Sequence, residues 1–566
     1  MKLSVAKLIS KHTKISEKQV NELIEVPPSS DLGDFAFPCF SLAQTFKKSP
    51  AEISKELKLK IEKSLPKEIE KTESKGPYLN FFVNKILLAE KTIAQILKEK
   101  DSYGKPKRSG KNKKIMIEFS QANTHKAFHV GHIRGTSLGE SLSRILEFNS
   151  VKVIRANYQG DTGMHVAKWI WCYNKYHKKT PLKNDEAWIA SIYVDSVKRL
   201  IENPNLEEDV NKINQKLEDR SDKFLNDLWR KTRKLSLDSF EKIYKQLNTH
   251  FDKYYFESEI ESLGKNIAEQ LLKKEIAVNS DGAVIMNLEK YGLGVWVLLR
   301  SDGTVLYSAK DLALAEIKFK DYKLDESLAL FGIAQQLHSR QLEKTLELMN
   351  FKKWKDYKFM HFSEVRLPTG KMSSRTGENI LYSDFLKELV VYARSQIKTR
   401  SPKISEKELE KRALIVSVAA IKYSMLKQDS HKTITFVKED AMNFEGNTGP
   451  YLLYSYARSK SILRKINGGK KKINKSKPKS LNESEKALIT KLSEFSQIVE
   501  SSLHQMNPSA IANYSFQLCQ CFNEFYHNSP VLNSENESFR ISLVEAFSQT
   551  VKNSLNLLGI DVLEEM

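Results

Sequence analysis

Two histidines, His129 and His132, are spaced for joint action in the segment His129-Val-Gly-His132. An apolar run at 115–119 precedes them, and apolar residues at helical spacing follow. This order predicts a strand, a tight turn and a helix at about 133–149, a geometry in which backbone N–H groups and a helix dipole bind phosphate. Gly131 lacks the side chain that would hold a flat ring such as adenine away from the backbone. Taken alone, the pair also fits histidines in a surface turn.

A second segment, Lys371-Met-Ser-Ser-Arg-Thr-Gly377, follows Pro368 and Gly370, which predicts a loop. A mobile lysine above a triphosphate can follow negative charge onto the leaving pyrophosphate, which lowers the barrier electrostatically. Alone, the segment could equally be an ordinary basic turn. With the histidine pair roughly 240 residues upstream, it predicts the second half of one nucleotide site.

The elements that must position these groups form three predicted domains, 1–105, 106–400 and 401–566. The first mixes helices with short strands such as 78–83, and a lysine-rich linker at 104–114 follows it. A strand at 115–120, the helix after His132 and a returning strand at 151–156 predict a parallel, doubly wound α/β sheet of the Rossmann type.

The remaining chain is predicted from its periodicity. Charged helical pattern at about 166–250 indicates a helical insertion in the sheet. Strand-like character returns at 282–286, 295–299 and 305–307, and from about 400 the chain is expected to be an all-α bundle. Within that bundle the basic segment 468–479 reads as a solvated tether that could touch an RNA backbone.

Bulk properties narrow the class of protein. The chain has 566 residues and a formal net charge of +21, which favours a phosphate-rich partner over a merely lysine-rich surface. No apolar run is long enough to span a membrane and no signal peptide is evident, so we expect a cytoplasmic protein. Four cysteines indicate a reducing compartment, and Cys519 and Cys521 suit helix packing better than zinc.

The two segments resemble the "HIGH" and "KMSKS" signatures of class I aminoacyl-tRNA synthetases. The resemblance implies that His129 and His132 stabilise the α-phosphoryl region of ATP and that Lys371 acts on the departing pyrophosphate. Ser374 replaces the second signature lysine, which leaves open whether Arg375 supplies that charge. The implied ATP-binding residues are His129, Gly131, His132, Lys371, Met372 and Ser373, and the implied catalytic residues are His129, His132, Lys371 and Arg375.

Nearly the whole chain resembles the arginyl-tRNA synthetase family. The segments that carry this resemblance are Glu118-Phe-Ser-Gln-Ala-Asn123, Asn157-Tyr-Gln-Gly-Asp161-Thr-Gly163, Asp302-Gly-Thr-Val-Leu-Tyr307-Ser-Ala-Lys-Asp311 and Gln335-Gln-Leu-His338. The resemblance implies that Asn123, Tyr307, Asp311 and Gln335 hold the amino acid. Thr162 and Ala122 depart from the usual Trp and Pro, which puts local packing in doubt more than function.

The chemistry of an arginine substrate agrees with these residues. A guanidinium is planar and permanently charged, so it requires a carboxylate with directed acceptors. We expect Asp311 to be that carboxylate, with Glu118 and Tyr307 as helpers. For each acidic residue the alternative is a structural ion pair.

Segments at both ends of the chain resemble the family's tRNA-binding regions. The stretches 31–40 and 76–80 resemble its N-terminal domain, and 446–458 and 513–566 resemble its helical anticodon-binding domain. Aromatic side chains there could stack on unpaired bases while cations hold the backbone. The implied tRNA contacts are Tyr454, Arg458, Tyr526 and Met566, whereas Ile511, Tyr514, Leu518, Phe522 and Phe525 follow helical spacing and are expected in the core.

The expected activity is therefore ATP-dependent formation of arginyl-adenylate and transfer of arginine to the 3′ end of tRNA(Arg). Mg²⁺ is expected to arrive with ATP, and no metal site is encoded. The resemblance also implies a monomer and an adenylation step that can require bound tRNA. The rivals are a synthetase for another amino acid, a non-catalytic RNA-binding paralogue and a small adenylyltransferase.

Overall fold

The computed structural model describes residues 1–106, 112–366, 368, 381–467 and 478–566. The chain forms two compact units. Unit 1 comprises Met1–Tyr103, Ile462–Phe495 and Gln520–Thr550, and unit 2 comprises Gly104–Ser461, Ser496–Cys519 and Val551–Met566. The predicted loop at 371–377 lies outside the described residues, as do parts of the predicted linker and of the basic tether.

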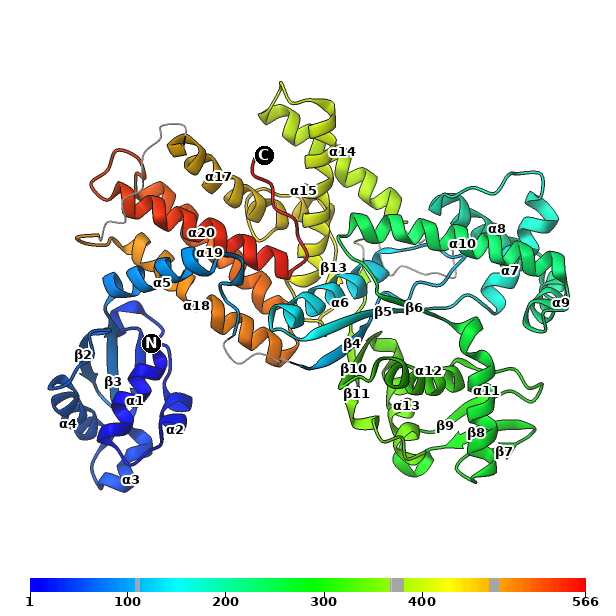
Figure 1. Cartoon of the computed structure of the whole chain (residues 1–566), viewed down its shortest axis with the longest axis horizontal. Coiled ribbons are helices and arrows are strands. Elements are labelled where there is room, and N and C mark those ends of the chain that lie inside the picture. The colour runs from blue at the N-terminus through cyan, green and yellow to red at the C-terminus, as the bar shows by residue number, and fades with distance from the viewer. Residues whose placement is uncertain (107–111, 367, 369–380, 468–477) are drawn as a thin grey trace. The chain divides into compact units, whose positions relative to one another are not determined.

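A five-stranded parallel sheet forms the centre of unit 2 (Figure 1), which confirms the predicted fold class. The chain runs from the middle strand to one edge, then returns to build the other edge from the middle outward. Strand order therefore reverses beside the middle strand, and in such sheets ligands bind outside the carboxyl ends of the strands at the reversal. In spatial order the strands are β11 (Tyr357–Phe362), β10 (Glu326–Gly332), β4 (Lys114–Glu118), β5 (Lys152–Gln159) and β6 (Lys253–Phe256).

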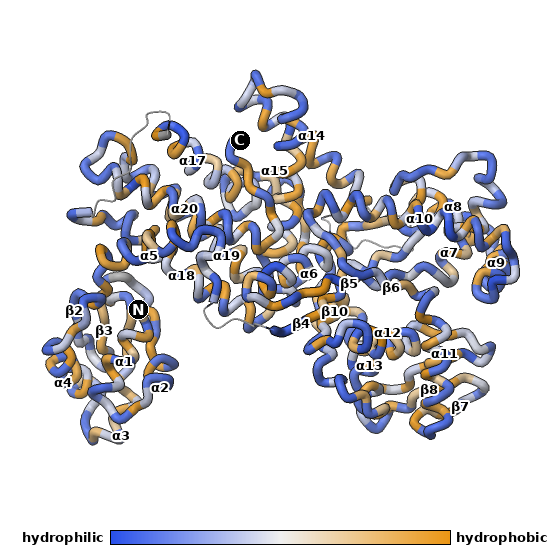
Figure 2. Tube along the Cα trace, in the orientation of Figure 1, coloured by the Kyte–Doolittle hydropathy of each residue, from blue (hydrophilic) through white to orange (hydrophobic). Residues whose placement is uncertain are grey.

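Strand β4 is apolar on both faces because helices cover the sheet on both sides. Met116 and Ile117, which point to opposite faces, are both fully buried. Helix α6 (Val130–Phe148) follows β4 and packs closely at Gly139, where a Cβ atom would come within 2.1 Å of the ring of Phe119. Hydrophobic residues also run along β10, whereas helix α9 (Glu207–Glu218) is mainly hydrophilic (Figure 2).

The expected helical insertion at 166–250 is present. It has its own apolar core, built around buried residues that include Trp169, Ile170 and Trp229. Its elements are α7 (Met164–Cys172), a π-helical turn at Tyr173–His177, α8 (Glu186–Glu202), α9 and α10 (Lys223–Gln246).

A small antiparallel sheet precedes β10 in the chain. It consists of β7 (Val278–Ser280), β8 (Ala283–Asn287) and β9 (Val295–Leu299), and it shares an apolar core with three flanking helices. The expected strand at 305–307 is wrong, because Val305 makes only an isolated bridge to Leu299 and Tyr307 already begins helix α12. The flanking helices are α11 (Glu257–Lys273), α12 (Tyr307–Tyr322) and α13 (Gln336–Leu348).

Beyond β11 the described chain is helical apart from a two-strand bridge between β12 (Val365–Arg366) and β13 (Ile434–Thr435). The five residues that helical spacing placed in the core are all buried. Phe522 and Phe525 belong to unit 1, and Ile511, Tyr514 and Leu518 belong to unit 2. The helices are α14 (Tyr382–Arg400), α15 (Glu406–Leu426), α16 (Lys438–Ala441), α17 (Gly449–Asn467), α18 (Glu483–Gln505), α19 (Ser509–Asn528) and α20 (Glu537–Leu557).

Unit 1 contains a three-stranded antiparallel sheet, in which the strand predicted at 78–83 is the middle one. Its strands in spatial order are β1 (Phe35–Pro38), β3 (Tyr78–Val83) and β2 (Ile69–Lys75). Helices α1 (Lys2–His12), α2 (Glu17–Leu23), α3 (Ala43–Phe46), α4 (Pro50–Glu62) and α5 (Lys85–Glu99) complete this part. In the described part of the chain, no helix is long and apolar enough to cross a bilayer.

Candidate active site

The two histidines open helix α6, and the helix starts earlier than predicted because they cap it. His129 is the N-cap residue, and its Nδ1 atom accepts a hydrogen bond from Gly131 N at 3.2 Å. His132 Nδ1 accepts from His129 N at 3.1 Å, which completes a capping box made of imidazoles. The rings stack with their centroids 3.9 Å apart, so the two histidines face the same way, as their spacing for joint action requires.

This capping arrangement fixes the proton on each ring. Because both Nδ1 atoms accept backbone N–H bonds, a neutral imidazole must carry its proton on Nε2. Burial, with a smaller contribution from the charge of Lys126, lowers the pKa of His129 to about 4. Burial and the neighbouring His129 and Lys126 also hold the pKa of His132 well below its usual range. At neutral pH the pair therefore presents two Nε2–H donors and no full charge.

Gly131 makes room for this geometry. A Cβ atom at position 131 would lie 3.0 Å from both Nδ1 and Cε1 of His129, which is closer than ordinary van der Waals contact. The absent side chain thus admits the His129 ring, a role that the sequence did not reveal.

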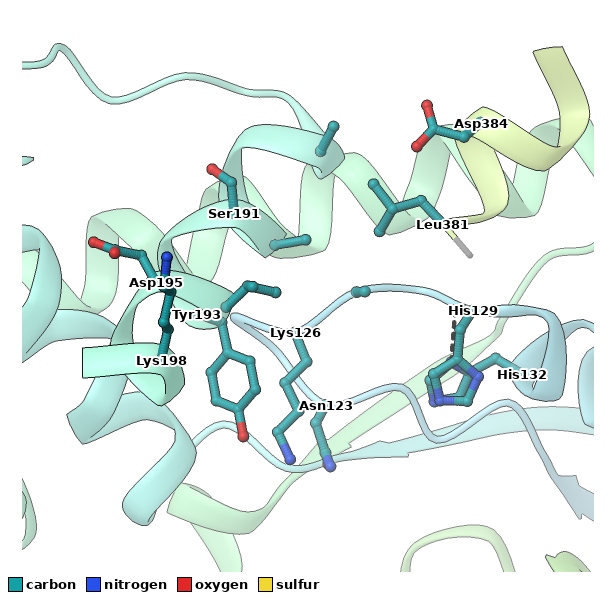
Figure 3. Close-up of a pocket in the computed structure, with 14 residues that line it drawn as sticks. Asn123, Lys126, His129, His132, Ser191, Tyr193, Asp195, Lys198, Leu381 and Asp384 are labelled. Atoms are coloured by element: carbon teal, nitrogen blue, oxygen red, sulfur yellow. Dashed lines mark hydrogen bonds between the residues drawn. The ribbon is translucent and has the colours of Figure 1, made fainter. Parts of the chain in front are cut away.

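A pocket of about 520 Å³ lies beside the histidines (Figure 3). Asn123 and Lys126, from the segment between β4 and α6, line it together with His129 and His132. Helix α8 forms the facing wall through residues that include Tyr193, whose ring lies 5.3 Å from Lys126 Nζ. The pocket therefore brings the predicted Asn123 and the two histidines to one cavity.

Asp311 lies in the first turns of α12 and is mostly buried. Its Oδ2 atom is 2.6 Å from Nε2 of His338, in the first turn of α13. The ring of Tyr307 lies edge-on to His338 at 4.8 Å, and Tyr307 itself is 58% exposed. Gln335, at the carboxyl end of β10, is exposed three residues before His338. Two predicted amino-acid-binding residues, Asp311 and Tyr307, thus contact one histidine to which the sequence had assigned no role.

Glu118 forms a structural ion pair, which is the alternative that the sequence left open. Its carboxylate is 2.5 Å from Lys318 Nζ, and both side chains are buried. Burial alone would lower the pKa of Lys318, but the Glu118 carboxylate raises it above its usual value. Gln121 Nε2 also donates to Glu118 at 2.7 Å. The Glu118 carboxylate is therefore already paired with one cation and one neutral donor, and its role in arginine binding stays a prediction.

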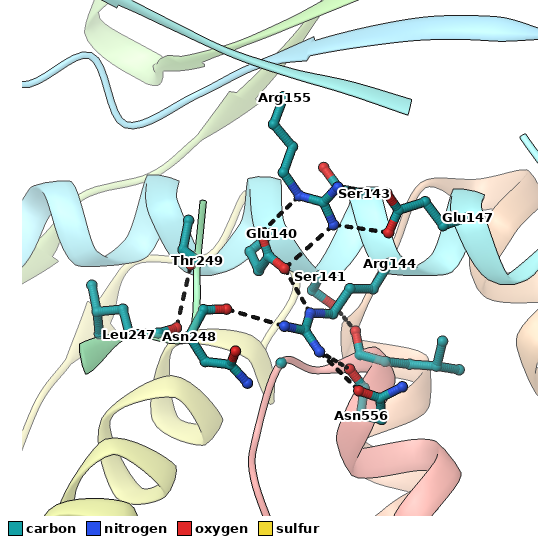
Figure 4. A network of polar contacts seen from close by, with 12 residues as sticks. Glu140, Ser141, Ser143, Arg144, Glu147, Arg155, Leu247, Asn248, Thr249 and Asn556 are labelled. Atoms are coloured by element: carbon teal, nitrogen blue, oxygen red, sulfur yellow. Dashed lines mark hydrogen bonds and ion pairs between the residues drawn. The ribbon is translucent and has the colours of Figure 1, made fainter. Parts of the chain in front are cut away.

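Helix α6 is also anchored along its length. Arg134 is fully buried, and its guanidinium donates to the backbone carbonyls of Ser363, Glu364, Asp429 and Ser430 at 2.9–3.3 Å. Nearly two turns further on, Glu140 accepts from Arg144 and Arg155 (Figure 4). Arg144 also donates to the backbone carbonyls of Asn248 and Asn556 (Figure 4). These bonds hold the helix that carries the histidines, although no sequence signal marked them.

Three potential metal ligands, Cys172, His177 and Asp195, lie together in the insertion. Asp195 Oδ2 already accepts from His177 Nε2 at 2.8 Å and from Arg199 Nε at 2.9 Å. Burial raises the pKa of the Cys172 thiol to about 12. A guanidinium therefore occupies the place where a cation would bind, and the cluster is an ion-paired anchor for α8.

The expected tRNA contacts fall in both units. Tyr454 and Arg458 pair on α17, where the guanidinium donates to the phenol oxygen at 3.0 Å. Tyr526 is 40% exposed, unlike its buried neighbour Phe525, and Met566 is partly exposed. Lys371, Met372, Ser373 and Arg375 lie outside the described residues.

The parallel sheet and the imidazole-capped helix after its middle strand belong to the catalytic domain of a class I aminoacyl-tRNA synthetase. A family model described as tRNA synthetases class I (R), catalytic domain, matches residues 92–437. The DALR anticodon binding domain matches 452–566, and the arginyl tRNA synthetase N terminal domain matches 1–83.

The chain belongs to the arginine–tRNA ligase family. It is 37% identical to an arginine–tRNA ligase of Clostridium acetobutylicum and 36% identical to one of Clostridium perfringens, each covering 99% of both chains. Its fold is similar to Thermus thermophilus arginyl-tRNA synthetase, with a TM-score of 0.80, 24% identity, and coverage of 100% of this chain and 99% of that one. The Plasmodium falciparum arginyl-tRNA synthetase gives a TM-score of 0.76 at 21% identity, with 96% and 94% covered.

Proposed function

We propose that the chain joins L-arginine to tRNA(Arg) in two steps, with both steps at the carboxyl ends of β4, β5 and β10. The proposed domains are 1–105 and 401–566 for tRNA binding and 106–400 for catalysis. In the first step the arginine carboxylate attacks the α-phosphorus of ATP, which releases pyrophosphate and forms arginyl-adenylate. In the second, the terminal ribose hydroxyl of tRNA attacks the acyl carbon and expels AMP.

The observation that carries this proposal is the pair of Nε2–H donors at the start of α6. Their Nδ1 atoms are occupied by backbone N–H groups, so the donors are fixed in direction before substrate binds. Donors that need no reorganisation stabilise charge that develops on a phosphoryl oxygen. The α6 dipole adds positive potential at the same end. We assign His129 and His132 to the α-phosphoryl group, and Gly131 to the space that the His129 ring requires.

Arginine recognition rests on Asp311 and the residues around it. The guanidinium would bind the Asp311 carboxylate, with the Tyr307 ring beside it. Asn123 and Gln335 would orient the rest of the amino acid from the ends of β4 and β10. Loss of the charge at Asp311 is expected to cost about 2–5 kcal/mol of transition-state binding, or about 30- to 5,000-fold in kcat/KM.

Residues outside the described ranges complete the proposed ATP site. Lys371, with Met372 and Ser373, would bind the triphosphate, and Arg375 would take the place of the missing second lysine at the pyrophosphate. Mg²⁺ would enter as part of the substrate MgATP, held by phosphate and water. Tyr454, Arg458, Tyr526 and Met566 would contact the anticodon loop.

The test is ATP–pyrophosphate exchange with each of the twenty amino acids, with and without tRNA. The Asp311→Ala variant is compared with Asp321→Ala, an exposed residue near the end of the same helix. Exchange with arginine alone, abolished by Asp311→Ala and kept by Asp321→Ala, supports the proposal. Exchange with another amino acid overturns the arginine assignment, and tRNA binding without any exchange would indicate a non-catalytic paralogue.

A further inference from the structure

We propose that His338 is a positioning residue for arginine selectivity. It holds one oxygen of Asp311 as a neutral hydrogen-bond donor, so that the whole negative charge of Asp311 remains for the guanidinium. This inference rests on the proposed function, because it assumes that Asp311 binds the substrate. It adds a residue that acts through Asp311 rather than on the substrate itself.

The surroundings of His338 hold its ring in one place. The ring lies 5.4 Å from Trp296 of β9, 4.8 Å from Tyr307 of α12 and 6.3 Å from Phe331 of β10. The His338 side chain is only 11% exposed and that of Asp311 12%. Three elements therefore fix the imidazole against the carboxylate, and its Nε2 atom meets Asp311 Oδ2 at 2.6 Å.

The indole of Trp296 determines which ring nitrogen of His338 carries the proton. The Trp296 indole N–H can only donate, and it donates to His338 Nδ1 at 3.3 Å. Nδ1 must therefore be the acceptor nitrogen, which places the single proton on Nε2, facing Asp311. An imidazolium would turn a second N–H toward the indole N–H, so two donors would oppose each other within a buried contact. The indole thus selects the neutral tautomer that donates to the carboxylate.

The charge of the partner decides how strongly Asp311 binds arginine. A lysine or a protonated histidine at position 338 would form a closed ion pair with Asp311, and the substrate guanidinium would have to compete with that cation. A neutral donor orients the carboxylate without cancelling its charge. Glu118 shows the other arrangement, because its Oε2 atom already pairs with the cation Lys318.

Two substitutions separate charge from packing. His338→Gln keeps a neutral amide N–H donor at similar reach, whereas His338→Lys puts a cation there. We expect His338→Gln to stay within about 5-fold of the parent in KM for arginine, and His338→Lys to raise that KM by about 100-fold or more. The KM for ATP should be unchanged in both variants. The ratio of kcat/KM for arginine over neutral citrulline should fall in His338→Lys alone.

The assay is ATP–pyrophosphate exchange on the full-length protein at saturating tRNA(Arg). The tryptophan fluorescence of each variant checks that the pocket is folded, because Trp296, which contacts His338, contributes to the signal. An equal rise of the KM for arginine in the Gln and Lys variants would show a purely structural role for His338 and overturn the inference. Asp311→Asn serves as the separate control. If Asp311→Asn left arginine binding intact, the proposed arginine pocket itself would be wrong. If Asp311→Asn weakened arginine binding but the two His338 variants had the same KM for arginine, only the inference about His338 would be rejected.

Discussion

Arg134 offers a quantitative test of how the histidine-bearing helix is held. Its buried guanidinium donates to four backbone carbonyls on two segments that precede β12 and β13. Replacement by Met, which has similar length and no donors, removes these four hydrogen bonds, although Glu364, Asp429 and Ser430 O each keep one backbone N–H donor. At roughly 1.5 kcal/mol for each hydrogen bond to the charged guanidinium, the loss is about 6 kcal/mol.

The Arg134→Met substitution also removes the cost of burying the guanidinium charge, which offsets part of the lost stability. Burial lowers the pKa of Arg134 from 12.5 to about 10, so the charged form is disfavoured by about 3 kcal/mol in the folded state. The free energy of unfolding of the Arg134→Met variant should therefore be about 3 kcal/mol lower than that of the parent. Because α6 would also lose its fixed position beside β12, exchange activity should fall even where the variant is folded.

The assay is urea unfolding followed by tryptophan fluorescence. All six tryptophans lie in unit 2, so the signal reports the unit that contains Arg134. The control is Arg230→Met on α10, where the guanidinium makes one exposed pair with Asp227 and should contribute less than about 0.5 kcal/mol. If Arg134→Met were as stable as the control, the reasoning that its four hydrogen bonds stabilise this unit would be refuted.

Two further predictions concern the start of α6 and the start of α8. Gly131→Ala should displace the His129 ring, because the new Cβ would lie 3.0 Å from it, and should lower the exchange rate by about 10-fold or more while the urea midpoint changes little; an unchanged rate would contradict the role of this glycine. Glu186 accepts from Phe128 N, and burial raises its pKa from 4.5 to about 7. The stability that this group contributes is therefore complete below pH 4.5 and is lost as pH rises through 7, by up to about 3 kcal/mol. Glu186→Gln should gain stability relative to the parent between pH 5 and pH 8 in urea titrations, and a constant difference would show that Glu186 does not titrate in this range.

The sequence by itself determined the features that depend on neighbours along the chain. The imidazole pair, the preceding strand and the following helix were all predicted, because spacing of one helical turn brings His129 and His132 together without help from distant residues. The burial of Phe522 and Phe525 and the exposure of Tyr526 were readable for the same reason, since helical periodicity separates adjacent positions. The strand predicted at 305–307 failed because a short apolar run does not distinguish a strand from the start of a buried helix.

Only the tertiary structure decided how the charged groups are paired. Glu118 and Lys318 come from different elements and meet because β4 and α12 pack in one core, and their pairing removes Glu118 as a free carboxylate. Asp311 faces the Nε2 atom of His338, because an indole from a third element donates to the other ring nitrogen. In a buried site the cost of a charge depends on the groups that surround it in space, and those neighbours are set by the packing of whole elements rather than by spacing along the chain.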